Sequence, residues 1–100
     1  MDMAGIKFTW DERKNRINQQ RHGISFTEAQ TVFYDKMARL IDDPEHSRDE
    51  ERVILLGMSQ NMRLLIVCHA YYPQKQIIRI ISARTATKTE QQQYTPYYIY

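Results

Sequence analysis

The fold is decided by residues 52–84, which read RVILLGMSQNMRLLIVCHAYYPQKQIIRIISAR. Three runs rich in Ile, Leu and Val, at residues 52–58, 63–72 and 76–84, are joined by two short polar connections. Runs of this length and composition are typical of β-strands. Because connections this short cannot carry the chain across to a parallel partner, the three strands are predicted to form an antiparallel meander.

The residues on either side of this meander carry helix and strand signals. Residues 6–10 alternate apolar and polar side chains, as a half-buried strand does. Residues 11–23 begin with two acids and end in Arg-His-Gly, an order of charges and a final glycine that favour a helix. Two capping boxes, at residues 25–28 and 87–90, predict the starts of two more helices, and residues 37–41 predict another strand.

Together these signals predict a single α+β domain over residues 1–100, with the element order β-α-α-β-β-β-β-α. We expect an antiparallel sheet with helices packed mainly on one face. Residues 95–100 form an aromatic tail, TPYYIY, to which the sequence assigns no role.

The composition is that of an ordinary globular domain, with 42% hydrophobic and 26% charged residues. No apolar run approaches the roughly 20 residues that cross a bilayer, and the first residues contain no apolar leader segment. The single cysteine, Cys68, cannot form an internal disulfide and suits a reducing compartment. We therefore expect a cytoplasmic protein.

The net charge of +2 conceals an uneven distribution. Residues 1–50 carry 8 bases and 10 acids, whereas residues 51–100 carry 6 bases and 2 acids. Such a separation allows one face of the molecule to be basic, which makes a nucleic-acid ligand plausible.

Two arginines and a histidine are predicted to lie in one row across the meander. A two-residue turn at residues 60–61 would place Arg52 opposite His69, and a five-residue connection after it would place His69 opposite Arg79. Phosphodiester cleavage needs guanidinium groups that bind the phosphate and an imidazole that moves protons. In the alternative interpretation, His69 is a core residue and Arg79 extends its charge from a half-buried strand.

Further candidates surround this row. Strand alternation sends Ser82 and Arg84 to the face opposite Arg79, unless a β-bulge redirects them. Arg84, at a strand end just before a helix start, either binds an anion or lies solvated at a sheet edge. Glu90 is either a general base or, more simply, the last residue of its capping box. Glu51 is either an acid–base residue or a partner in a salt bridge to a neighbouring strand.

The basic helix at residues 11–23 offers Lys14, Arg21 and His22, and Lys88 begins the last helix. The basic helix contains little apolar surface to bury, so contact with a nucleic-acid backbone competes with the simpler interpretation of a solvated face. The tyrosines of the second half either stack on bases or close the core.

No cofactor or metal ion is expected. The sequence contains no P-loop, dinucleotide-binding fingerprint, zinc-ligand spacing or Cys/His nucleophile pair. The acidic loop at residues 42–51 lacks the glycine and the regular oxygen ligands of a calcium loop, so it is interpreted as a solvated loop or as a docking surface for a basic partner.

A set of short motifs resembles the BrnT family of bacterial toxins, and the similarity runs from about Lys7 to Tyr94. The motifs are FTWDE at 8–12 with Lys14 and Asn15; RHGISF at 21–26 with Glu28 and Ala29; DPEHS at 43–47 with Glu50, Glu51 and Arg52; Gly57; and RIISAR at 79–84 with Ala86 and Glu90. Each motif alone is weak, but the set in this order is specific.

The resemblance implies a small endoribonuclease toxin of a type II toxin–antitoxin pair, with a fold related to RelE toxins. Such toxins cleave RNA without a metal ion and inhibit translation. The implied partner is a separate antitoxin with a DNA-binding part, and the complex of the two would repress its own operon. Operator DNA would be contacted only through that complex.

The family motifs carry over Arg52, Arg79, Arg84, Glu51 and His22 as site residues, whereas His69 comes only from the register argument. One hypothesis combines the family motifs with the register argument. In this hypothesis the arginines hold the scissile phosphate. His69 or Glu51 takes the proton of the ribose 2′-OH, which attacks the phosphorus.

Lys14, Arg21 and Lys88 would steer the RNA in this hypothesis. The alternative function is a binding module without catalysis, which uses the same basic face to hold nucleic acid or a protein.

Overall fold

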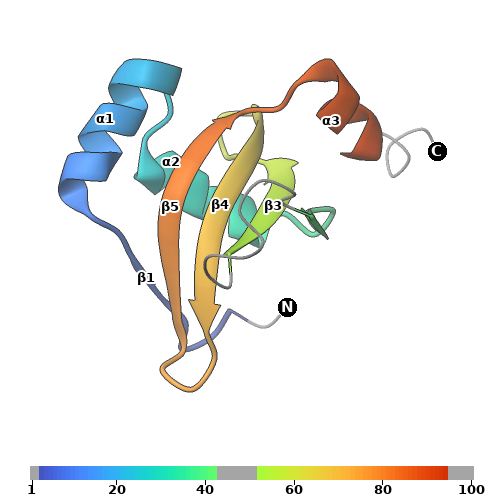
Figure 1. Cartoon of the computed structure of the whole chain (residues 1–100). Coiled ribbons are helices and arrows are strands. Elements are labelled where there is room, and N and C mark those ends of the chain that lie inside the picture. The colour runs from blue at the N-terminus through green and yellow to red at the C-terminus, as the bar shows by residue number, and fades with distance from the viewer. Residues whose placement is uncertain (1–2, 43–51, 95–100) are drawn as a thin grey trace.

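The computed structural model describes residues 3–42 and 52–94, which form a five-stranded sheet with three α-helices (Figure 1). The acidic loop from residue 43 onward, Glu51 and the tail at 95–100 lie outside the described residues. The elements are β1 (Lys7–Thr9), α1 (Glu12–His22), α2 (Phe26–Thr31), a 3-10 turn η1 (Val32–Tyr34), β2 (Arg39–Ile41), β3 (Arg52–Met58), β4 (Leu64–Tyr72), β5 (Ile77–Thr85) and α3 (Lys88–Tyr94).

The sheet is mixed, so the prediction of an antiparallel sheet is wrong at one edge. The strand order is β1-β5-β4-β3-β2, and all neighbours are antiparallel except β1 and β5. Strand β1 pairs in parallel with residues 77–79 of β5. A parallel neighbour is possible here because the whole of the chain from α1 to β4 lies between the two strands and serves as the crossover.

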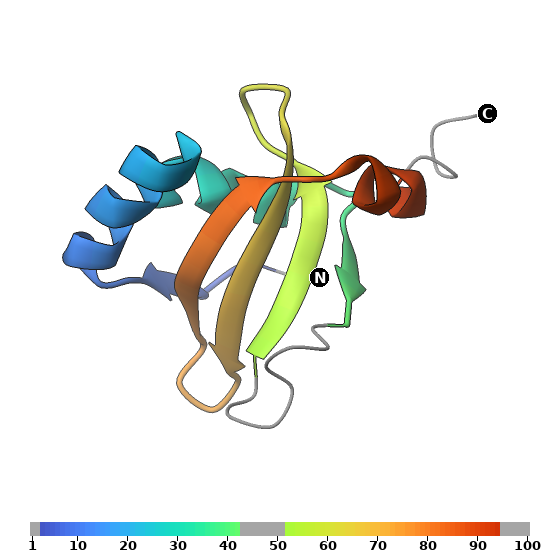
Figure 2. The ribbon, with the colours of Figure 1, turned by 45° about the horizontal axis from the view of Figure 1, so that its top comes forward.

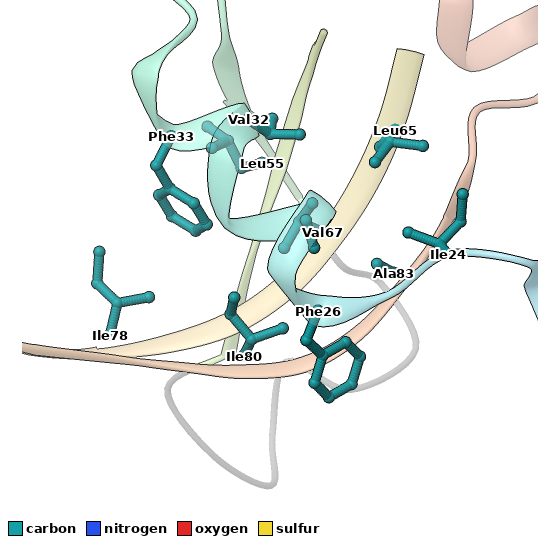
Figure 3. Packing of buried hydrophobic residues seen from close by; sticks show 11 residues of the cluster. Ile24, Phe26, Val32, Phe33, Leu55, Leu65, Val67, Ile78, Ile80 and Ala83 are labelled. Carbon is teal, nitrogen blue, oxygen red and sulfur yellow. The ribbon is translucent and has the colours of Figure 1, made fainter. Parts of the chain in front are cut away.

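The main core lies between the sheet and the segment formed by α2 and η1 (Figure 3). Phe26, Val32 and Phe33 from that segment pack on Leu55, Val67 and other side chains of the three long strands. All eleven buried members of this cluster are at most 8% exposed. Helix α2 lies on this side of the sheet, and α1 flanks the edge of β5 (Figure 1).

Among the described elements, α3 lies on the other face of the sheet, at one end (Figure 2). Tyr94 of α3 is 2% exposed and packs with Leu56 and Ile66, and its hydroxyl donates to Asp35 Oδ2 at 2.6 Å. Within residues 3–42 and 52–94, no helix combines the length and the apolar character needed to span a membrane.

Helix α1 is attached by polar rather than apolar contacts. Asp11 caps its first turn by accepting from Arg13 N, and Gly23 ends it in the left-handed conformation at φ 70°. Its buried residues are Asn15 and Asn18. Because this attachment uses two short amides, the rest of the helix surface stays exposed and cationic.

Of the two predicted capping boxes, one is complete. Glu90 N donates to Thr87 Oγ1 at 3.2 Å, and Thr87 N donates back to Glu90 Oε1 at 2.9 Å. In the other, Ser25 accepts from Glu28 N, but the Glu28 carboxylate turns to Ser59 and Arg63 instead. The arginine hydrogen bonds lower the pKa of Glu28, and this ion pair fastens the β3–β4 turn to α2.

Candidate nucleic-acid interface

The β3–β4 connection is one residue longer than predicted. Ser59 N donates to Arg63 O at 2.8 Å, so three residues form the loop, and Met62 adopts the left-handed conformation at φ 64°. A left-handed third residue is a common way to close a three-residue hairpin. The register therefore shifts, and Arg52 lies opposite Ala70 rather than His69.

The β4–β5 connection is one residue shorter than predicted, and this second error offsets the first. Tyr72 pairs with Ile77, and Arg79 consequently lies opposite Ala70. Arg52 and Arg79 thus face the same residue of the central strand from its two sides. The prediction that these two arginines share a row and a face is correct, with Ala70 in the middle position.

His69 does not belong to the row, because neighbouring residues of a strand point to opposite faces. It pairs with Val53 and Ile80 on the helix-covered side and is 2% exposed. Its ring lies 4.8 Å from that of Phe33, and burial lowers the pKa of the imidazole. The interpretation of His69 as a core residue is the correct one.

A β-bulge returns Ser82 and Arg84 to the face of the arginine row. Pairing shifts between Cys68 and His69, so that Ile80 pairs with His69 while Ser82 pairs with Cys68, and Ile81 is the extra residue. Strict alternation would have placed Ser82 and Arg84 on the opposite face. The sequence allowed a β-bulge as an exception to strict alternation, and the structure contains a β-bulge in this strand.

Strand β1 adds a residue that the sequence analysis missed. Lys7 and Thr9 pair with Ile77 and Arg79, and both are exposed, whereas Phe8 between them packs on Phe33. Lys7 therefore extends the cationic face beyond β5. The alternation of residues 6–10 already placed Lys7 on the polar side, but nothing in the sequence indicated the parallel pairing that brings it beside β5.

Arg84 is held by a carboxylate. Its Nη1 and Nη2 donate to Glu90 Oε1 and Oε2, both at 2.8 Å. Hydrogen bonds from Arg84 lower the pKa of Glu90 to about 2, assisted by the Thr87 backbone and opposed by burial. Arg79 differs from Arg84, because no carboxylate among the described residues pairs with Arg79.

The other side chains predicted to bind RNA lie outside the row. Lys14, Arg21 and His22 are exposed on α1, which flanks the edge of β5, and Lys88 is exposed at the start of α3 (Figure 1). We name the set of Lys7, Arg52, Arg79, Ser82 and Arg84 the cationic face.

The geometry of the cationic face suits a phosphodiester. Arg52 and Arg79 stand two strands apart, about 10 Å between backbones, so two long side chains can meet at one phosphate between them. Ala70 between them carries only a methyl group, so β4 itself places no long side chain between the two guanidinium groups. Within residues 3–42 and 52–94, no three His, Cys, Asp or Glu residues gather as metal ligands would.

The fold and the cationic face define a class: a small α+β protein with a five-stranded mixed sheet that carries several cations on one face. A sequence model described as "Ribonuclease toxin, BrnT, of type II toxin-antitoxin system" matches residues 10–90. The chain therefore belongs to the BrnT family of ribonuclease toxins, as its motifs indicated.

A solved structure supports the fold. The chain is similar to the ribonuclease toxin BrnT of Brucella abortus, known from a crystal structure at 1.1 Å resolution, with a TM-score of 0.64. The two are 20% identical over 83% of this chain and 99% of that one. No curated protein sequence matches the chain.

Proposed function

We propose that this toxin is an endoribonuclease that cleaves RNA by attack of a ribose 2′-OH, with the scissile phosphate held between Arg79 and Arg52. The observation that carries the proposal is the register that places both arginines opposite Ala70 on one face of the sheet. Two guanidinium groups at one phosphate supply the charge-assisted hydrogen bonds that stabilise a pentacoordinate transition state.

In the proposed reaction the 2′-oxygen forms a bond to phosphorus as its proton passes to a base. The bond from phosphorus to the 5′-oxygen breaks, and that oxygen leaves with a proton. The products are a 2′,3′-cyclic phosphate and a 5′-OH. DNA has no 2′-OH and would not be cleaved.

Glu51 remains the proposed base of this reaction. It precedes Arg52, one end of the row, and it lies outside the described residues. His69 is not proposed for the role, because it lies on the opposite side of the sheet.

Arg84 is proposed to bind a flanking phosphate rather than the scissile one. Its partner on β4, Ile66, lies four residues from Ala70, which is about 13 Å along the strand. The guanidinium is also engaged with Glu90, so a phosphate must compete with that carboxylate. Lys14, Arg21, His22 and Lys88 would steer the RNA through long-range attraction.

The family places this chain in a type II toxin–antitoxin pair, and the finer points remain proposals. These are cleavage without a metal ion, inhibition of translation, a relation of the fold to RelE toxins, an antitoxin with a DNA-binding part, and repression of the operon by the complex.

Purified chain in excess chelator, incubated with an RNA oligonucleotide, tests the reaction. We expect products that end in a 2′,3′-cyclic phosphate and no cleavage where the nucleotide is 2′-deoxy. Arg79→Ala should lower the rate at least about 100-fold, as loss of one donor to a transition-state oxyanion does elsewhere.

Lys75→Ala is the matched control, because Lys75 is an exposed cation in the β4–β5 turn. RNA binding and the melting temperature of Arg79→Ala must stay near those of the wild type for the result to count as loss of catalysis. If the wild type binds RNA and never cleaves it, the chain is a binding module and the proposal is wrong.

A further inference from the structure

Two hollows lie on either side of Tyr34, next to η1. The first has a volume of about 370 Å³ and reaches from Tyr34 to Leu40 and His69. The second, of about 500 Å³, is more open and reaches from Tyr34 to Met62. Because Tyr34 and Asp35 line both, the hollows form one continuous surface, which we name the Tyr34 groove.

The most exposed apolar side chains of the described residues gather at this groove. Met62 is 81% exposed, Tyr34 59% and Leu40 58%, and each lines one or both hollows. The other exposed large apolar side chains do not exceed 43%. Single exposed apolar residues are common, but a cluster beside a hollow is typical of a protein-binding surface.

A buried imidazole lies in the wall of the first hollow. His69 is 2% exposed and lines that hollow together with Phe33. Its Nδ1 lies 3.2 Å from Val67 O, and the ring makes no other hydrogen bond to a described residue. Because Nδ1 faces a carbonyl oxygen and therefore carries the proton, the second ring nitrogen can accept a hydrogen bond from an occupant of the hollow.

The charges around the groove indicate what the occupant is. The Asp35 carboxylate already accepts hydrogen bonds from Met37 N, Met58 N and the Tyr94 hydroxyl. Lys36 is exposed and makes no hydrogen bond or ion pair to a described residue. The groove therefore offers an occupant largely apolar walls, the Lys36 ammonium, and an Asp35 carboxylate that is already hydrogen-bonded within the chain.

This chemistry disfavours RNA. One cation in an apolar groove offers little to a polyphosphate, and the cationic face lies on the other side of the sheet. A segment with apolar side chains and a carboxylate is complementary.

We propose that the antitoxin of this toxin docks in the Tyr34 groove, by a segment that inserts one apolar side chain into each hollow and pairs an acidic side chain with Lys36. The proposal rests on membership in a toxin–antitoxin family and adds the site of that partner. The antitoxin thereby binds on the helix-covered side of the sheet, away from the arginine row.

The experiment uses the full chain and, as the probe, the purified product of the short reading frame adjacent to its gene. Leu40→Asp and Met62→Asp each place a charge in one hollow. Both side chains are more than half exposed, so the variants should fold. Affinity for the probe is measured by calorimetry, and RNA cleavage and the melting temperature are measured on the same samples.

We expect each variant to weaken binding of the probe at least tenfold while RNA cleavage stays within about twofold of the wild type. Ile17→Asp, at an exposed apolar residue on α1 that lines neither hollow, should bind the probe as the wild type does.

Two results would overturn the docking site. One is unchanged binding of the probe to both variants. The other is a dimer of the wild-type chain that Leu40→Asp dissociates, which would assign the groove to a second copy. If the groove variants lose the probe but the wild type cleaves no RNA, the proposed ribonuclease reaction fails while the docking site stands.

Discussion

At the scale of single residues, the side chain of Asn18 makes backbone hydrogen bonds that a neighbouring strand would otherwise make. Strand β1 pairs only with residues 77–79, so the edge of β5 beyond them has no neighbouring strand. Asn18 Oδ1 accepts from Ala83 N at 3.1 Å, and its Nδ2 donates to Ala83 O and Ile24 O, both at 2.8 Å. One amide thus pairs the backbone of the sheet edge and attaches α1 to it.

Asn18→Ala should lower the free energy of unfolding by about 2–3 kcal/mol, because it leaves the buried groups of Ala83 and Ile24 without partners. The free energy of unfolding is measured by urea denaturation followed by circular dichroism. Gln20→Ala, an exposed change on the same helix, should stay within about 0.5 kcal/mol of the wild type. Equal stability of the two variants would refute this role of Asn18.

Glu90 makes the stability depend on pH. Its pKa lies at about 2 in the folded chain against 4.5 in the unfolded one, mainly because Arg84 binds it. A lowered pKa means that the contribution is fully present above pH 4.5 and is lost as the pH falls toward 2. Since Arg84 is partly exposed, we expect about 1 kcal/mol.

Glu90→Gln should therefore destabilise the chain at pH 7 and have almost no effect at pH 2, as measured by urea denaturation at both values. Asp42→Asn, at an exposed carboxylate, serves as the control. A difference between wild type and Glu90→Gln that persists undiminished at pH 2 would contradict the ion pair.

At the scale of elements, the bulge in β5 explains why Arg79 and Arg84 share a face. Deletion of Ile81 removes the extra residue and leaves Ile80, Ser82 and Ala83 on the faces they now occupy. We expect this deletion to preserve the fold, with native-like circular dichroism and a cooperative melting transition. Deletion of Val67, in a part of β4 without an extra residue, should reverse the faces of half a strand and abolish folding. Loss of folding in both would disprove the bulge.

The elements themselves could be predicted, whereas their pairing could not. Period-2 and capping signals located all three helices and the five strands, because these signals depend on near neighbours in the sequence. The registers depended on turn lengths, and a left-handed Met62 or a four-residue turn at residues 73–76 changes each by one residue. The parallel partner of β1 leaves no local signal at all.

The same limit applies to the candidate site. Arg52 and Arg79 were placed together only because two register errors offset each other, and the row that included His69 was wrong by one residue. Arg84 required a bulge that no motif specified. Residue type predicted a cationic site, but only the three-dimensional pairing shows which cations share a face.

At the scale of the whole molecule, α1 and the cationic face form two basic regions that one RNA strand can follow. Each phosphate neutralised on a single strand contributes about −0.7 to the slope of log affinity against log salt. With a non-cleavable 2′-deoxy analogue, the double variant Lys14→Ala, Arg21→Ala should reduce the steepness of that slope by about 1.4, because both side chains are exposed on α1 beside the edge of β5. Lys75→Ala, at an exposed cation of the β4–β5 turn, should leave the slope unchanged. An unchanged slope in the double variant would show that the strand does not pass along α1, and the steering of RNA would then fall to the cationic face alone.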